Sequence, residues 1–313
     1  MKVLVTGGAG FIGSNTVFAL LAAGHDVLVI DDLSTGHMGN LDPRASFRKL
    51  DILDDETRVV IAEFAPEGVV HLAAQASVSV SVAQPERDRA VNAEGTRRIA
   101  VAARDAGARV MVSASTAAVY GEPEMVPLIE TARKAPMSPY GSSKLEAEGL
   151  MATELRGSGT DFASFRFANV YGPRQDAAGE GGVVAIFCDR MHRSERPVLF
   201  GDGSQTRDFV FVGDVVAAII AALSAAAPLA AEGPDGPAYN VGTGERTSVN
   251  QLLMSMRVAA GYFGPSDTAS SREGDILHSA LSPSKAQAAL GWRAGVELET
   301  GLAMTWRWFA AQG

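Results

Sequence analysis

The first thirty-one residues constrain the fold more than any other stretch of this 313-residue chain. An apolar run leads into a glycine-rich turn, TGGAGFIG at residues 6–13, and a second apolar run ends at Asp31. This order predicts a strand, a tight turn, a helix and a second strand. In such a unit Gly7 permits the turn, Gly10 lets a pyrophosphate approach the backbone, and Gly13 lets the helix pack on the strand. The N–H groups at the helix N-terminus then face the phosphates.

Asp31 lies eighteen residues beyond Gly13, where a carboxylate accepts hydrogen bonds from the ribose of an adenosine. Its charge would repel a 2′-phosphate, so the sequence predicts NAD rather than NADP as the cofactor. Glycines also mark ordinary turns, and the pattern gains its weight from the two strands, the helix and the acid around it.

Strand and helix patterns alternate through the first half of the chain. We expect strands at residues 1–6, 26–30, 46–50, 68–72, 109–113 and 162–167, and helices at 11–23, 55–64, 90–106 and 139–156. The alternation predicts an α/β fold, a Rossmann-type doubly wound parallel sheet, with a smaller C-terminal α/β substrate-binding lobe. We expect an NAD-binding domain at 1–170, to which later segments at about 205–240 return, and mainly the substrate-binding lobe at 171–313.

Composition excludes several classes of partner. The 27 basic and 36 acidic residues give a net charge of −9, which argues against a nucleic-acid surface or an anionic membrane as the partner. Cys188 is the only cysteine, so we expect no internal disulfide and no metal site, and a reducing cytoplasm suits the chain. We expect no signal peptide, and the longest apolar run, 215–231, predicts a core helix followed by a loop.

Tyr140 and Lys144 carry the chemistry that the sequence predicts. They open a helix after Pro139, and their four-residue spacing places the phenol and the ammonium on one helix face. A tyrosine titrates near pH 10, so it becomes a base at neutral pH only if its phenolate is stabilised. Lys144 and a positively charged nicotinamide ring supply that stabilisation. The pair on its own is also typical of an ordinary helix surface.

The chain resembles the extended short-chain dehydrogenase/reductases of the nucleotide-sugar epimerase and dehydratase family, and is most similar to UDP-glucose 4-epimerases. Nearly the whole length is covered, and the matching stretches are 6–13, 31–36, 71–74, 92–96, 116–121, 140–144, 169–175, 201–212 and 272–275. The resemblance implies 4-epimerisation of a UDP-sugar through a transient 4-keto intermediate. It also implies NAD held between turnovers, and a homodimer formed through helices near 90–106 and 139–156.

The resemblance also implies roles for individual residues. Tyr140 is the expected base, Lys144 its electrostatic partner, and Thr116 the hydroxyl that orients the sugar 4-OH, with Ser115 as the alternative hydroxyl. The expected cofactor contacts are Gly7, Gly10, Phe11, Ile12, Gly13, Asp31, Asp32, Leu33, Ser34, Thr35, Gly36, Asp51, Ile52, Leu72, Ala73, Ala74, Gln75, Asn92, Ser113, Ser115, Tyr140, Lys144, Phe167 and Ala168. The expected substrate contacts are Thr116, Tyr140, Asn169, Gly182, Val183, Val184, Phe200, Gln205, Arg207, Arg272 and Asp275.

Four other residues bear on the reaction and the sugar. Family members that eliminate water or carbon dioxide carry acids where this chain has Ala117 and Ala118, so we expect epimerisation alone. Asp176 would oppose a 6-carboxylate, which favours a neutral hexose, with UDP-glucuronate 4-epimerisation as the nearest alternative. Ser279 replaces a large residue that excludes N-acetyl sugars in some epimerases, so a UDP-N-acetylhexosamine remains an alternative. A non-catalytic dinucleotide-binding module is the alternative of a different class.

Overall fold

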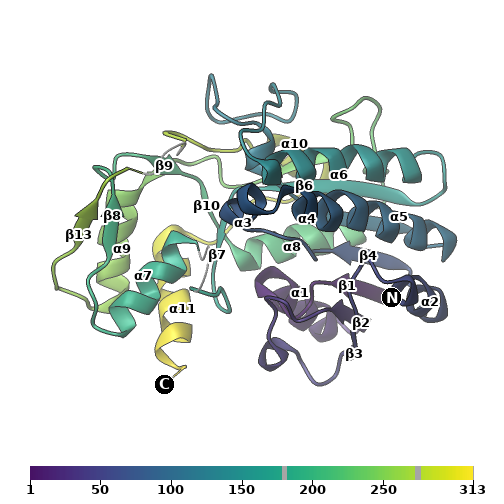
Figure 1. Ribbon diagram of the computed structural model, residues 1–313, viewed down its shortest axis with the longest axis horizontal. Coiled ribbons are helices and arrows are strands. Elements are labelled where there is room, and N and C mark those ends of the chain that lie inside the picture. The colour runs from purple at the N-terminus through teal and green to yellow at the C-terminus, as the bar shows by residue number, and fades with distance from the viewer. Residues whose placement is uncertain (178–181, 272–275, 313) are drawn as a thin grey trace.

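The computed structural model describes residues 1–177, 182–271 and 276–312, and a seven-stranded sheet dominates it (Figure 1). All of its strands are parallel, in the order β11-β6-β5-β4-β1-β2-β3. Their bounds are β1 Lys2–Thr6, β2 Asp26–Asp31, β3 Ser46–Lys49, β4 Gly68–His71, β5 Val110–Thr116, β6 Asp161–Phe167 and β11 Ala238–Val241. The run β3-β2-β1-β4-β5-β6 is the Rossmann order, and the predicted doubly wound sheet is confirmed.

Helices cover both faces of this sheet because its strands alternate apolar side chains between two cores. Val3 and Val5 of β1 face α1 (Phe11–Ala22), α8 (Val212–Leu223) and α10 (Ser284–Leu290). Leu4, between them, faces α2 (Asp55–Phe64), α5 (Gly95–Asp105) and α6 (Pro139–Leu155). The short helices α3 (Val78–Ala83) and α4 (Pro85–Arg89) lie against α6.

A third apolar core holds the C-terminal lobe, which lies to the left of the sheet in Figure 1. Its helices are α7 (Val183–His192), α9 (Val249–Ala260) and α11 (Leu298–Ala310). Three strand pairs border them: β7 (Asn169–Tyr171) with β10 (Phe209–Phe211), β8 (Val198–Phe200) with β13 (Asp267–Ala269), and β9 (Thr206–Arg207) with β12 (Thr247–Ser248). Only the β9–β12 pair is antiparallel.

Two departures from the predicted elements lie beside the predicted catalytic residues. The strand expected at 109–113 continues to Thr116, because residues 114–116 pair with β6. The helix expected at 90–106 begins with a π-helical turn, Ala90–Glu94, before α5. Such turns widen a helix locally and are frequent at functional sites.

None of the helices in the described part of the chain combines the length and hydrophobicity that crossing a bilayer requires.

Candidate active site

The glycine turn is packed so closely that side chains are excluded at two positions. Gly7 has φ +70°, and a Cβ there would lie 2.6 Å from the backbone nitrogen of Ala73. A Cβ on Gly13 would lie 2.0 Å from the carbonyl oxygen of Gly7. Gly10 caps α1 without any side-chain hydrogen bond. The positive N-terminal end of α1 therefore presents its first N–H groups to a ligand.

Asp31, at the end of β2, holds this turn in place. Its Oδ2 accepts a hydrogen bond from the Ala9 N–H at 2.9 Å, and its Oδ1 accepts one from the Leu33 N–H at 2.8 Å. Burial raises the pKa of the carboxyl group, against the effect of these two bonds. Asp32 is exposed and accepts hydrogen bonds from Ser34. Asp31 thus joins the loop at 31–36 to the glycine turn.

The turn that follows Thr116 packs closely on the first turn of α6, which contains Tyr140. Thr116 ends β5, and its Oγ1 accepts the Ala118 N–H at 3.1 Å, which leaves its own proton to donate. Gly141 follows Tyr140 in the first turn of α6, and a Cβ there would lie 2.7 Å from the Ala118 carbonyl oxygen. Tyr140 therefore lies at the start of a helix that packs on the turn following Thr116.

Lys144 follows one turn later and is almost fully buried, with 4% of its surface exposed. Its Nζ donates to the Ala114 carbonyl oxygen at 3.0 Å. Burial lowers the pKa of Lys144 to about 8, while the negative charges of Asp88 and Glu148 act in the opposite direction. The predicted helix that begins at Pro139 and carries Tyr140 and Lys144 is present as α6, and Lys144 places it beside β5.

Ser115 points away from Thr116, because successive side chains of a strand alternate between faces. Its hydroxyl donates to Oε1 of Glu148 at 2.5 Å. Glu148 also accepts two bonds from Arg166, at 2.9 Å from Nε and 2.6 Å from Nη2. This arrangement favours Thr116 over Ser115 as the hydroxyl that faces a substrate.

Arg166 is the centre of a buried polar cluster that sequence reasoning missed. The side chain is 1% exposed, and besides Glu148 it donates to Asp235 at 3.1 Å and to the Tyr120 hydroxyl at 3.0 Å. It connects β6 to α6 and to the loops on either side. Its partners are 18, 46 and 69 residues away in the sequence, so no local pattern indicates them.

Asp88 is a second missed residue, and it has no exposed surface. Its carboxylate accepts hydrogen bonds from Gln75 Nε2 at 2.7 Å, Asn92 Nδ2 at 3.1 Å and Ser143 Oγ at 2.5 Å. Asn92, a predicted cofactor contact, lies in the π-helical turn. The i,i+4 spacing of Asp88 and Asn92, which places both on one helix face, was an available signal.

A buried histidine connects the glycine unit to the same cluster. His71 Nδ1 lies 2.7 Å from Thr6 Oγ1, and its Nε2 lies 3.1 Å from Thr96 Oγ1. The Thr96 hydroxyl donates to the Asn92 carbonyl oxygen, so the proton of the ring belongs on Nε2. Burial and the charge of Lys144 lower the pKa of His71 to about 3, so the ring is neutral.

The predicted substrate residues lie on several elements of the second half. Asn169 begins β7 and donates its N–H to the Asp208 carbonyl oxygen at 2.8 Å. Asp208 directly follows Arg207, the last residue of β9. Gln205 Nε2 donates to the Phe200 carbonyl oxygen. Gly182, Val183 and Val184 form the N-terminus of α7, which has no side-chain cap. Arg272 and Asp275 lie outside the described residues, but the following segment, 277–279, bonds to Thr206.

Other predicted cofactor residues lie at or just beyond the C-terminal ends of β3, β4 and β6. Asp51 and Ile52 follow β3 at the edge of the sheet, where the Asp51 carbonyl oxygen accepts from Thr57 of α2 and Ile52 packs in the core. Leu72, Ala73 and Ala74 follow β4 directly beside the glycine turn. Phe167 ends β6, and Ala168 bonds to Val241 of β11.

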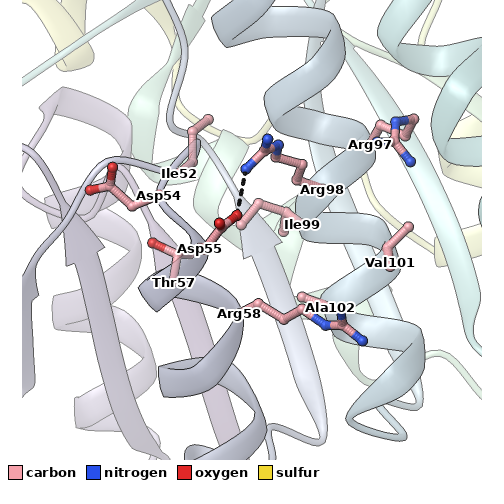
Figure 2. Close-up of a pocket in the computed structure, with 10 residues that line it drawn as sticks. All are labelled: Ile52, Asp54, Asp55, Thr57, Arg58, Arg97, Arg98, Ile99, Val101 and Ala102. Carbon is pink, nitrogen blue, oxygen red and sulfur yellow. Dashed lines mark hydrogen bonds and ion pairs between the residues drawn. The ribbon is translucent and has the colours of Figure 1, made fainter.

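A pocket of about 210 Å³ lies between α2 and α5, and among the predicted site residues that the structure describes, Ile52 alone lines it (Figure 2). Its three arginines are paired with acids: Arg58 with Asp105 at 2.9 Å, Arg97 with Glu94 at 2.7 Å, and Arg98 with Asp55 at 3.3 Å. Neither Tyr140 nor Lys144 lines it. We therefore assign the chemistry to the strand ends and not to this pocket.

Comparison with known proteins places this geometry among enzymes of one kind. Residues 3–242 match the model of the NAD dependent epimerase/dehydratase family. The UDP-glucose 4-epimerase of Mycolicibacterium smegmatis is 42% identical, with 99% of this chain and 98% of that protein covered. The crystal structure of the Thermotoga maritima UDP-glucose 4-epimerase with UDP-glucose is 40% identical, with a TM-score of 0.94 over 100% of this chain and 99% of that one. A UDP-N-acetylglucosamine 4-epimerase from Methanobrevibacter ruminantium is 31% identical, with a TM-score of 0.92 over 100% and 99%.

Proposed function

This chain belongs to the NAD-dependent epimerase/dehydratase family, and from that premise we propose that it interconverts UDP-glucose and UDP-galactose by 4-epimerisation. The observation that carries the proposal is the close packing of α6 on the end of β5. Thr116 ends β5, the first turn of α6 contains Tyr140, and the buried Lys144 donates to Ala114 of β5. Full-length similarity to UDP-glucose 4-epimerases supports the same reaction.

The residues of the glycine unit fit NAD as the cofactor. The uncapped N-terminus of α1 suits a pyrophosphate, and a Cβ on Gly10 would meet nothing closer than the Gly7 carbonyl oxygen at 3.3 Å. Asp31 offers its carboxylate to an adenosine ribose. We propose that residues 1–170, with the returning segments near 205–240, hold NAD, and that 171–313 mainly hold the UDP-sugar. NAD, when bound, supplies a hydride acceptor that takes the C4 hydrogen of the sugar and gives it back.

Tyr140 acts as the base in this proposal. Its phenolate oxygen takes the proton of the sugar 4-OH as the C4 hydride leaves, and returns a proton when the 4-keto sugar is reduced on its other face. The Lys144 ammonium favours the phenolate because an adjacent positive charge lowers the pKa of a phenol. Thr116, whose Oγ1 already accepts the Ala118 N–H, donates a hydrogen bond to the sugar 4-oxygen and keeps its proton.

Epimerisation is favoured over elimination by the turn that follows Thr116. Ala117 and Ala118 begin the 3₁₀ turn Ala117–Val119, and neither carries a group that transfers protons. Removing water or carbon dioxide from the 4-keto sugar requires a further acid and base. The keto sugar is therefore reduced again.

The UDP moiety is assigned to residues of the C-terminal lobe. Arg207 and Arg272 supply guanidinium groups, which match diphosphate oxygens well. The uncapped N-terminus of α7 at Gly182 supplies backbone N–H groups, and Asn169, at the start of β7, is assigned to the sugar and diphosphate.

The sugar itself is the least constrained part of the proposal. Asp176 lies 3.7 Å from His37, beyond the end of β2, so the preference for a neutral hexose rests instead on the similarity to UDP-glucose 4-epimerases. Ser279 is small and half-buried, and its N–H donates to the Thr206 carbonyl oxygen beside Arg207. This residue and the likeness to a UDP-N-acetylglucosamine 4-epimerase favour UDP-N-acetylhexosamines as the second candidate.

We also propose a homodimer and a cytoplasmic location. Helices α5 and α6 pack side by side on one flank of the sheet, and Gly149, on the exposed side of α6, leaves room for a helix of a second copy. A monomeric mass by light scattering would contradict the dimer. The unpaired Cys188 suits a reducing compartment, and recovery from a secreted fraction would contradict the location.

A panel of nucleotide sugars tests the proposed substrate. Purified protein is incubated separately with UDP-galactose, UDP-glucose, UDP-glucuronate and UDP-N-acetylglucosamine, and the products are separated by chromatography. We expect interconversion of the first two. Faster turnover of UDP-N-acetylglucosamine or UDP-glucuronate would reassign the sugar, and no turnover of any member would favour a non-catalytic dinucleotide-binding module.

A further inference from the structure

Asp88 is a fully buried carboxylate that the proposed reaction does not use. Its three hydrogen-bond donors, Gln75, Asn92 and Ser143, are all neutral. Within the described ranges it forms no ion pair, because Arg89, the neighbour on α4, turns outward to Glu146 at 2.5 Å. Burying a charge without a paired counter-ion costs free energy of folding, so we expect this carboxylate to have a function.

The titratable and charged groups around Lys144 indicate what that function is. From β4, His71 is neutral; from α6, Tyr140 is the phenol and Glu148 is a carboxylate. Glu148 is already neutralised by the two-bond pair with Arg166 of β6. Asp88, on α4, is the remaining negative charge, and it is fully buried and bonded to Ser143, the residue next to Lys144. Its charge favours the protonated form of Lys144.

We infer that Asp88 is a positioning residue that keeps Lys144 protonated by its uncompensated charge. The inference rests on the proposed function for its purpose, because a neutral lysine cannot stabilise the phenolate of Tyr140. Burial opposes the ammonium form of Lys144, and a nicotinamide bearing a positive charge opposes it further. The charge of Asp88 offsets both effects. Its carboxylate accepts a hydrogen bond from Ser143, the residue that precedes Lys144 on α6.

Two substitutions separate the charge of Asp88 from its hydrogen bonds. Asp88→Asn removes the charge but keeps the size of the side chain. The Ser143 hydroxyl then accepts from the new amide and donates to the Tyr140 carbonyl oxygen, which already lies 3.0 Å away. Ser143→Ala removes the hydrogen bond of 2.5 Å and leaves the charge in place.

The protonation state of Lys144 is read directly by NMR. The chain has five lysines, so protein labelled with ¹³C-lysine gives few signals, and Lys144→Met identifies the signal of Lys144. The NAD-loaded protein and both variants are titrated from neutral to alkaline pH. We expect Asp88→Asn to lower the pKa of Lys144 by about one unit, the lower end of the effect of a nearby opposite charge. Ser143→Ala is expected to keep the wild-type midpoint.

An unchanged midpoint in Asp88→Asn, or an equal shift in Ser143→Ala, would overturn the inference. If Asp88→Asn does not fold, Asp88→Ser gives the same loss of charge with a smaller side chain, and the same outcomes apply. With UDP-galactose, the alkaline limb of kcat should move to lower pH in Asp88→Asn. The titration needs no turnover, so an inactive wild-type protein would count against the proposed function alone.

Discussion

Replacing Tyr140 with phenylalanine is expected to lower kcat for UDP-hexose epimerisation by about 10²- to 10⁴-fold, the usual contribution of a positioned acid–base group. The substitution removes the oxygen that carries the proton and leaves the ring in its place. Chromatography of UDP-galactose and UDP-glucose measures the rate, and NAD content measured on the same protein shows that the cofactor site is intact.

Tyr262→Phe is the matched control. It removes the same oxygen from a tyrosine of the C-terminal lobe, where the hydroxyl donates to the Pro265 carbonyl oxygen. Its kcat should stay close to that of the wild type. Thr116→Val should lower kcat much more than Ser115→Ala, because the Ser115 hydroxyl is bonded to Glu148. A Tyr140→Phe protein with wild-type kcat would remove the phenol from the mechanism.

The second large effect is on stability. Replacing Arg166 with methionine is expected to lower the free energy of unfolding by about 3–5 kcal/mol, the usual cost of breaking a buried ion pair. The change leaves the carboxylates of Glu148 and Asp235 without their shared partner. Urea unfolding followed by circular dichroism measures the loss.

Arg58→Met serves as its control, because it breaks an exposed ion pair with Asp105 at 2.9 Å. Such pairs contribute about 0–1 kcal/mol. A loss below about 1 kcal/mol in Arg166→Met would show that this cluster does not hold β6, α6 and the adjoining loops together.

The sequence predicted the sheet and the glycine turn well because their signals are local. Strands β1 and β2 alternate with helices at short range, and Gly7 and Gly13 occupy positions where a Cβ would clash with backbone atoms. The Tyr140–Lys144 pair was equally visible, because helix spacing alone brings residues four apart onto one face. The boundary at Thr116 was missed because pairing with β6, and not local composition, extends β5.

The electrostatic setting of the site could not be predicted in this way. Ser143 and Asp88 are 55 residues apart, and Arg166 and Asp235 are 69 apart, so only the folded chain brings them together. No local pattern in the sequence indicates that Asp176 lies beside His37. Residues that act through a neighbour's charge leave no spacing pattern, whereas residues that bind a cofactor do.

The proposed removal and return of the C4 hydride is tested most directly with UDP-galactose that carries deuterium at C4. After conversion by the purified NAD-loaded protein, mass spectrometry locates the label in the UDP-glucose formed. If the C4 hydrogen is removed and given back within one active site, the deuterium stays at C4 of the product. Loss of the deuterium to water, or recovery of UDP-galactose unchanged, would contradict the mechanism.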